Sequence, residues 1–178
     1  PKSTKILWSA QKLIGENGIF AGNSGIIQLP TGVGKTKSIE LIIRSAFLSG
    51  RTNTVLIIAP LRALCGEIKS DLQFAFGNEA NINHFSDVLQ DDFNLLFEDD
   101  KNNIIISTPE KIEYIIYHQK DLLDRVGLYI FDEGHMFDSR SRGASYELLV
   151  TTVKRSIDWT KQIVFISAVL SNAYEISK

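Results

Sequence analysis

The sequence predicts an α/β fold in which helices cover both faces of a mostly parallel, doubly wound sheet. Three observations lead to this prediction. Short apolar segments alternate with amphipathic ones, no repeat or low-complexity linker divides the 178 residues, and 44% of the residues are hydrophobic. Because a single core commonly serves about 100 to 200 residues, we expect one domain over residues 1–178.

Apolar runs short enough to be buried strands recur along the chain, each followed by a polar or Gly/Pro turn. They are residues 25–29, 54–59, 104–107, 128–131 and 163–167. Between them lie segments with apolar residues at intervals of three and four, which predict helices. These are residues 4–15, 35–48, 61–76, 110–119 and 144–158. Such alternation implies right-handed crossovers between parallel strands.

The segment 77–103 has no readable period, because acidic and amide residues interrupt its apolar ones. We expect it to hold one short strand and one helix. Its seven carboxylates are interpreted as a solvated edge of the domain.

Composition excludes several classes of protein. A formal net charge of −2 leaves no overall positive field, so any contact with nucleic acid has to be local. Cys65 is the only cysteine, which excludes an intrachain disulfide and a cysteine-cluster metal site and favours a reducing, cytoplasmic setting. No apolar run approaches the ~20 residues of a membrane span, so no membrane partner is expected. Pro1 as the first residue predicts a processed chain or a piece of a longer one.

The stretch LPTGVGKT, residues 29–36, lies between a predicted strand and a predicted helix. Ligands of open α/β sheets bind beyond the carboxyl ends of the strands, where this turn is expected to lie. Gly32 and Gly34 allow positive φ and a close approach of backbone N–H groups to an anion, and the helix start adds its positive end. The alternative is a glycine-rich turn with a solvated lysine.

The loop therefore predicts a nucleotide-phosphate site. Lys35 supplies a full charge for the β- and γ-phosphates, and the Thr36 hydroxyl can ligate Mg²⁺ carried with the nucleotide. Leu29 stands where the strict P-loop pattern has glycine. The residues expected to contact the nucleotide here are Pro30, Thr31, Gly32, Val33, Gly34, Lys35 and Thr36.

The run LYIFDEGHMF, residues 128–137, places two carboxylates at the end of another predicted strand. In a parallel sheet that end shares an edge with the phosphate loop. Asp132 is expected to hold Mg²⁺, directly or through water, and Glu133 to orient or deprotonate the attacking water. His135 could hydrogen-bond toward the γ-phosphate or a neighbouring segment; the alternative is a surface histidine. Together with the loop, these residues predict an ATPase.

These motifs resemble those of superfamily 2 helicases of the DExH-box type, and most closely the superkiller-like branch. LPTGVGKT looks like motif I and DEGH like motif II. APLRAL at 59–64, TPEK at 108–111 and SAVLSN at 167–172 resemble motifs Ia, Ib and III in the family's order. RGASYELLV at 142–150 and SAVLSNAYEI resemble segments of the superkiller-like branch.

The resemblance implies a RecA-like P-loop fold and further roles. Gln11 is similar in placement to the glutamine that reads adenine in related helicases; a surface glutamine on a helix is the alternative. The residues implied in contacts with a single strand of DNA or RNA are Pro60, Arg62, Thr108 and Lys111, although both prolines could simply end strands. Ser167 and Ala168 are implied in coupling the ATP state to strand movement.

The chain departs from the family pattern at two positions. Val169 stands where motif III commonly has threonine, so it cannot donate a hydroxyl hydrogen bond. Gly134 replaces the common alanine of motif II, which changes backbone freedom more than chemistry.

The resemblance also implies a second RecA-like lobe, which carries arginine fingers. We therefore expect the chain to be the first lobe of a longer helicase, and to bind nucleotide weakly and hydrolyse it slowly or not at all by itself. Two other functions remain open. One is a motor that moves along duplex or remodels nucleoprotein without unwinding, and the other is a nucleotide-binding switch or scaffold.

Overall fold

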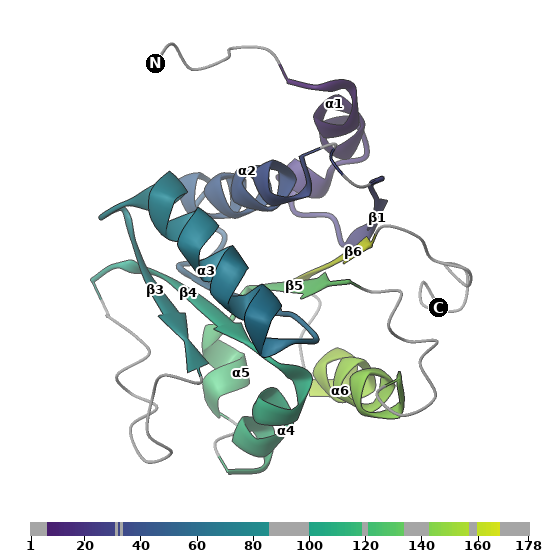
Figure 1. The fold of residues 1–178 in the computed structure, drawn as a ribbon, viewed down its shortest axis with the longest axis vertical. Coiled ribbons are helices and arrows are strands. Elements are labelled where there is room, and N and C mark those ends of the chain that lie inside the picture. The colour runs from purple at the N-terminus through teal and green to yellow at the C-terminus, as the bar shows by residue number, and fades with distance from the viewer. Residues whose placement is uncertain are drawn as a thin grey trace.

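The computed structural model describes residues 7–30, 32, 34–85, 100–118, 121–133, 143–156 and 160–167. Its strands are β1 (Gly25–Gln28), β2 (Thr54–Ile58), β3 (Ala80–His84), β4 (Asn102–Ser107), β5 (Leu128–Asp132) and β6 (Gln162–Ser167). They form one sheet in the spatial order β1-β6-β5-β2-β4-β3, and every neighbouring pair is parallel (Figure 1). The predicted α/β fold with a parallel sheet is confirmed.

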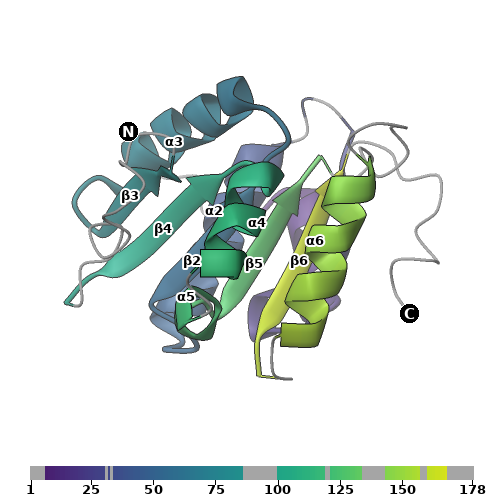
Figure 2. The same ribbon diagram turned by 90° about the horizontal axis from the view of Figure 1, so that it is seen from below.

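Helices cover both faces of this sheet, as the sequence predicts. One face carries α2 (Lys35–Leu48) and α3 (Arg62–Phe76), and the other carries α4 (Pro109–His118), α5 (Asp121–Arg125) and α6 (Gly143–Ser156) (Figures 1 and 2). The helix α1 (Ser9–Glu16) and the 3-10 turn η1 (Ile19–Ala21) pack beside α2.

Burial follows from these two layers of helix. Every residue of β2, β5 and β6 is buried, because these central strands are covered on both faces. Two apolar clusters result. One lies between the sheet and α1 to α3, and the other lies between the sheet and α4 to α6. No helix in the part of the chain that the structure describes has the length and apolar character of a membrane span.

The structure departs from the predictions at α1 and α5, and it contains the strand expected within 77–103. Of the helix predicted over 4–15, residues 4–6 lie outside the described residues and Leu7 and Trp8 are not helical. The helix begins at Ser9, because Trp8 is extended (φ −67°, ψ 158°) and its N–H donates to Gln11 Oε1 at 3.0 Å. The strand expected within 77–103 is β3, the edge strand; the helix expected there can fall only among residues 86–99, outside the described residues. The short helix α5 was not predicted.

Candidate functional site

The carboxyl edge of the sheet gathers the ends of β1, β5 and β6. Parallel pairing places Gln28 opposite Ser167 and Asp132 opposite Ile166. The N–H of Leu29 donates to the carbonyl of Ser167 at 2.9 Å, so the chain entering the glycine-rich turn is tied to the end of β6. The fully buried Ser167 therefore lies on the strand between the predicted phosphate loop and the predicted acidic motif.

The turn after β1 has the backbone that the glycines predict. Gly32 and Gly34 both have φ +84°, in the left-handed region that other residues rarely adopt. Gly34 is the N-cap of α2, and its carbonyl accepts the Ser38 N–H at 2.9 Å. Lys35 and Thr36 are the first two residues of this 14-residue helix, so both lie at its positive end.

Trp8 contacts this turn, a contact that no sequence motif predicts. A Cβ built on Gly34 would lie 3.0 Å from the indole of Trp8, and 3.9 Å from Nε2 of Gln11. The structure thus places the N-terminal end of α1 against the phosphate loop. Gln11 is 4% exposed, which rules out the alternative of a surface glutamine.

Lys35 joins the loop to the acidic motif. Its Nζ lies 2.9 Å from Oδ1 of Asp132 and also forms an ion pair with Oε1 of Glu133. The Asp132 side chain is only 2% exposed, whereas those of Lys35 and Glu133 are 28% and 20% exposed. The two motifs predicted to share an edge are therefore in direct contact.

The electrostatics of this cluster follow from burial and pairing. Burial acts to lower the pKa of Lys35, but hydrogen bonds and attraction to Glu133 and Asp132 outweigh it and raise the pKa. Burial raises the pKa of Asp132, and the Lys35 ammonium only partly opposes that rise. Pairing decides the pKa of Lys35, because Lys35 has two carboxylate partners and is partly exposed. Burial decides the pKa of Asp132, because Asp132 is almost completely desolvated and lies beside a second carboxylate.

Glu133 has an unusual backbone. Its φ is +53°, and it is the only non-glycine residue with positive φ among those the structure describes. A side chain in the left-handed region costs about 1–2 kcal/mol relative to the right-handed one. Such conformations cluster where a function requires a particular side-chain direction. Here the conformation accompanies the contact between Glu133 and Lys35.

The carboxylates at this edge of the sheet can be compared with those that bind metal ions. Within the described ranges no group of three His, Cys, Asp or Glu residues could hold a metal by itself. Mg²⁺, however, is commonly bound by one or two carboxylates together with substrate phosphates. A buried carboxylate, a second carboxylate and a helix N-terminus at the same edge fit a cation that arrives with a nucleotide.

A second part of the same edge lies at β2 and β4. Ile58 is opposite Ser107, and the N–H of Ala59 donates to the carbonyl of Ser107 at 3.0 Å. The helices α3 and α4 begin directly beyond, at Arg62 and Pro109. Their N-termini are therefore neighbours and point toward the same edge.

The side chains predicted to contact nucleic acid differ in their exposure to solvent. Arg62 is exposed and Lys111 is half-buried. Pro60 and Thr108 are buried. The predictions for Thr31, Val33, His135 and Ala168 fall outside the described residues.

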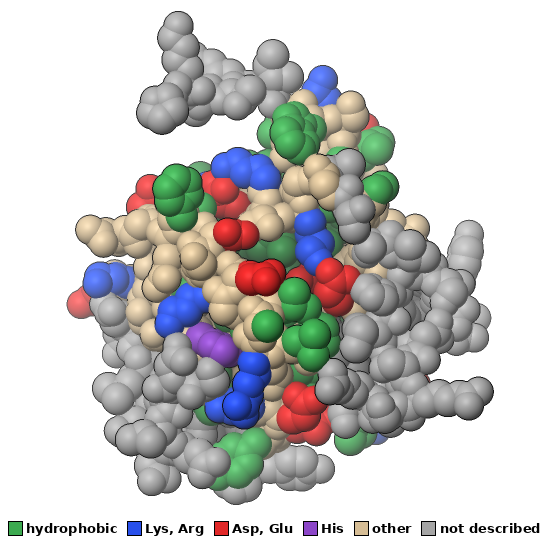
Figure 3. Space-filling view, in the orientation of Figure 1, with side chains coloured by type: hydrophobic (Ala, Val, Ile, Leu, Met, Phe, Trp, Pro, Cys, Tyr) green, Lys and Arg blue, Asp and Glu red, His purple; other side chains and the backbone are tan. Residues whose placement is uncertain are grey.

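The distribution of charge on the surface agrees with the small formal net charge of −2. Figure 3 shows basic and acidic side chains intermixed on the face that carries α2 and α3, without a continuous basic area among the residues drawn in colour. Contacts with a polyanion therefore depend on a few groups rather than on a basic face.

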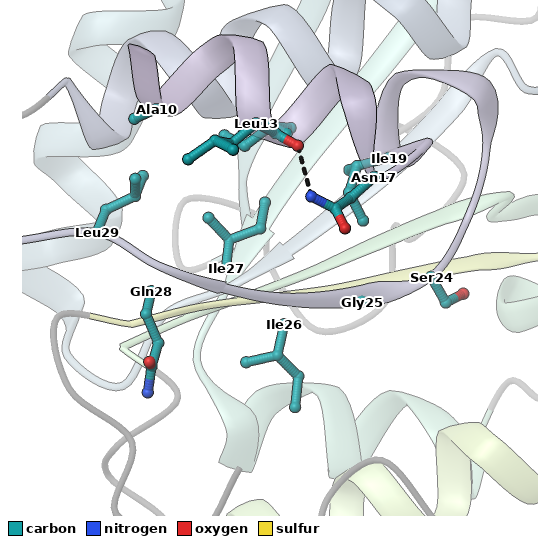
Figure 4. A pocket seen from close by; sticks show the side chains of 11 residues that line it. Ala10, Leu13, Asn17, Ile19, Ser24, Gly25, Ile26, Ile27, Gln28 and Leu29 are labelled. Carbon is teal, nitrogen blue, oxygen red and sulfur yellow. Dashed lines mark hydrogen bonds between the residues drawn. The ribbon is translucent and has the colours of Figure 1, made fainter. Parts of the chain in front are cut away.

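A pocket of about 390 Å³ lies between α1 and the edge strand β1 (Figure 4). Ala10 and Leu13 approach it from α1, Ile27 points into it from β1, and Leu29 points into it from just after that strand. Neither Lys35 nor Asp132 lines it, so this pocket is distinct from the charged cluster.

Comparison with known proteins identifies the family. Residues 8–176 match the DEAD/DEAH box helicase family. The chain belongs to this family. It is thus a superfamily 2 helicase domain with an ATP-binding P-loop. The RecA-like fold agrees with the crystal structure of the DUF1998 helicase MrfA, which has a TM-score of 0.77 at 20% identity and covers 99% of this chain and 29% of that one.

Individual relatives of this helicase domain are much longer. The Hachiman protein HamB of Bacillus cereus is 32% identical over 90% of the chain. The probable ATP-dependent DNA helicase HFM1 of Xenopus tropicalis is 33% identical over 78% of it. The ATP-dependent DNA helicase Hel308 of Methanocaldococcus jannaschii is 27% identical over 94% of it. The chain spans 15%, 11% and 14% of their lengths.

Proposed function

We propose that this helicase domain is the first RecA-like lobe of an ATP-dependent motor of the superkiller-like branch that moves along single-stranded nucleic acid. The observation that carries the proposal is the direct contact of Lys35 with Asp132 and Glu133, which unites a phosphate loop with two carboxylates. RGASYELLV and SAVLSNAYEI support the branch. Similarity to two proteins named as ATP-dependent DNA helicases favours DNA as the strand.

The roles of the residues follow from their chemistry. Pro30 begins the loop, and the backbone N–H groups from Thr31 to Thr36 at the N-terminus of α2 bind the phosphates. Lys35 exchanges its carboxylates for phosphate oxygens when nucleotide enters. Glu133, the more exposed carboxylate, accepts a proton from the attacking water or orients it. Gln11 reads the base from α1, which packs against the same loop.

Mg²⁺ would be held by Asp132, directly or through water, and by the hydroxyl of Thr36. When bound, it neutralises phosphate charge. Burial of Asp132 serves this role, because a desolvated carboxylate attracts a cation more strongly than a solvated one. His135 would contact the γ-phosphate or a neighbouring segment.

Nucleic acid would lie along the edge formed by β2 and β4. Arg62 and Lys111 contact backbone phosphates there, helped by the N-termini of α3 and α4. Ser167 would transmit the nucleotide state, since its strand lies between the loop and Asp132. Ala168 would share this role. The second lobe would close over both sites and supply the arginine fingers.

The test is ATP turnover by the full-length protein with and without single-stranded DNA or RNA. We expect stimulation by DNA, loss of turnover in Lys35→Ala, and retained ATP binding without turnover in Glu133→Gln. The isolated chain is expected to hydrolyse ATP far more slowly, because an arginine finger raises the turnover rate of other nucleotide hydrolases by a factor of about 10³ to 10⁵. Turnover by the isolated chain that equals the full-length rate would refute the two-lobe proposal.

A strand-displacement assay separates the remaining functions. Stimulated turnover without displacement would favour a double-strand translocase or a nucleoprotein remodeller. ATP binding without any turnover in the wild-type full-length protein would favour a switch or scaffold. RNA stimulation that exceeds DNA stimulation would contradict DNA as the strand while leaving the motor in place.

A further inference from the structure

Phe85 and Lys111 form a contact that no predicted role accounts for. The Nζ of Lys111 lies 5.2 Å from the centroid of the Phe85 ring. Lys111 is in the first turn of α4, and Phe85 directly follows β3. Because His84 pairs with Ile106 on β4, both residues lie at the carboxyl edge where the nucleic-acid contacts are proposed. The contact therefore joins β3, one of the two edge strands of the sheet, to that region.

The position of Lys111 is electrostatically unusual. The first turn of a helix favours acidic side chains, such as Glu110 one residue earlier, and disfavours a cation. A free lysine side chain also has many rotamers to lose before it can bind. An aromatic ring within about 6 Å of an ammonium attracts it through the negative face of the ring. Phe85 thus offsets the helix dipole and restricts where the ammonium lies.

Phe85 itself is well held. It is 3% exposed and belongs to the apolar cluster beneath α4, α5 and α6. A buried ring in a packed core has little freedom, so it offers Lys111 a fixed surface. The ammonium and the N-terminal N–H groups of α4 then lie together at one place, beside the carboxylate of Glu110.

We propose that Phe85 is a positioning residue for nucleic-acid binding. Its ring holds the Lys111 ammonium at the carboxyl edge, so that a phosphate meets a cation already in place. This makes β3 a third element of the binding edge, beside β2 and β4. The inference rests on the proposed contact of Lys111 with nucleic acid.

A double-mutant cycle in the full-length protein tests it. Affinity for fluorescein-labelled oligo(dT) is measured over a range of salt for wild type, Phe85→Leu, Lys111→Met and the double variant. Lys111→Met is expected to weaken binding and to reduce the slope of log affinity against log salt by about 0.7, as for one lost phosphate contact on a single strand. Phe85→Leu alone is expected to weaken binding about two- to fivefold.

The double variant distinguishes positioning from packing. If Phe85 acts through Lys111, Phe85→Leu causes no further loss once Lys111 is Met, and Phe85→Tyr, which keeps the ring, binds like wild type. An equal loss in both backgrounds, or no loss in Phe85→Leu, would overturn the inference. Unchanged affinity in Lys111→Met would instead refute the proposed contact itself. Phe85→Met serves as a second ring-free variant if Phe85→Leu fails to fold.

Phe76 provides a matched control. It is also 3% exposed and lies under a cation, with Arg44 Cζ 4.3 Å from its ring centroid. It ends α3, however, at the end opposite the proposed binding edge. Phe76→Leu is expected to lower the unfolding midpoint as Phe85→Leu does and to leave oligo(dT) affinity unchanged. If Phe76→Leu weakens binding equally, the loss reflects stability and the inference is wrong.

Discussion

The Nζ of Lys35 lies 2.9 Å from Oδ1 of Asp132, and this contact joins the loop after β1 to the end of β5 across the intervening strand β6. It holds a buried carboxylate beside a helix N-terminus. The same atoms are those that we expect nucleotide phosphates and Mg²⁺ to contact. The pair therefore links the stability of the domain to its chemistry.

Removal of the lysine should destabilise the domain in a pH-dependent way. Lys35→Ala leaves Asp132 buried beside Glu133 without its cation. We expect a loss of about 1–3 kcal/mol in the free energy of unfolding at pH 7, less than for a fully buried pair because the Lys35 side chain is 28% exposed. Urea unfolding of the variant and wild type at several pH values measures it.

The sign of the pH dependence follows from the raised pKa of Asp132. A raised pKa in the folded state means that stability is fully present below the unfolded pKa of about 3.9 and is lost as pH rises through the folded value. The free energy of unfolding that Lys35→Ala loses relative to wild type should therefore grow from pH 4 upward. Adding Asp132→Asn should recover part of it. A double variant no more stable than Lys35→Ala at pH 7 would contradict this account.

Gly34→Ala should impair nucleotide binding. The φ of +84° at Gly34 disfavours a side chain by about 1–2 kcal/mol, and the new Cβ would press on Trp8 at 3.0 Å. We expect roughly a tenfold loss of affinity for a fluorescent ATP analogue. Gly50→Ala is the control. Gly50 has φ +67°, a Cβ added there would lie in open space, and the residue follows the far end of α2. It should cost stability and leave nucleotide affinity unchanged; equal losses of affinity would argue against a local effect.

The backbone of Glu133 predicts a conflict between stability and activity. Glu133→Gly and Glu133→Ala both lose the ion pair with Lys35, but only glycine also relieves the positive φ of 53°. We expect Glu133→Gly to be about 1 kcal/mol more stable than Glu133→Ala, while neither hydrolyses ATP in the full-length protein. Thermal melting compares the two. A more stable alanine variant would show that this conformation is not strained.

Cys65 offers a probe of opening of the fold. It is fully buried in α3, and burial raises the pKa of its thiol to about 11. Since the thiolate is the reactive form, a disulfide reagent at pH 8 should react very slowly with the native chain and rapidly with the chain in urea. The raised pKa also predicts that stability falls as pH rises from about 8.5 through 11. Rapid native reaction at pH 8 would contradict this prediction.

Sequence patterns predicted the parts of the fold that depend on local chemistry. The apolar runs of β1, β2, β4, β5 and β6 and the period of α2 stand out because burial on one or two faces favours apolar side chains at the buried positions. In β3, Asn81 and Asn83 alternate with buried residues at an exposed edge of the sheet, so the apolar signal was weak. The five residues of α5 were too few to show a period.

The sequence by itself determined that a phosphate loop and an acidic motif follow two strands of a parallel sheet, since glycine, lysine and carboxylate spacing is a local property. Only the tertiary structure decided which strands are neighbours. It placed Ser167 between the two motifs, Trp8 against Gly34, and Phe85 beneath Lys111. These contacts join residues far apart in the chain. They depend on strand order and on the packing of helices over the sheet, which no local pattern encodes.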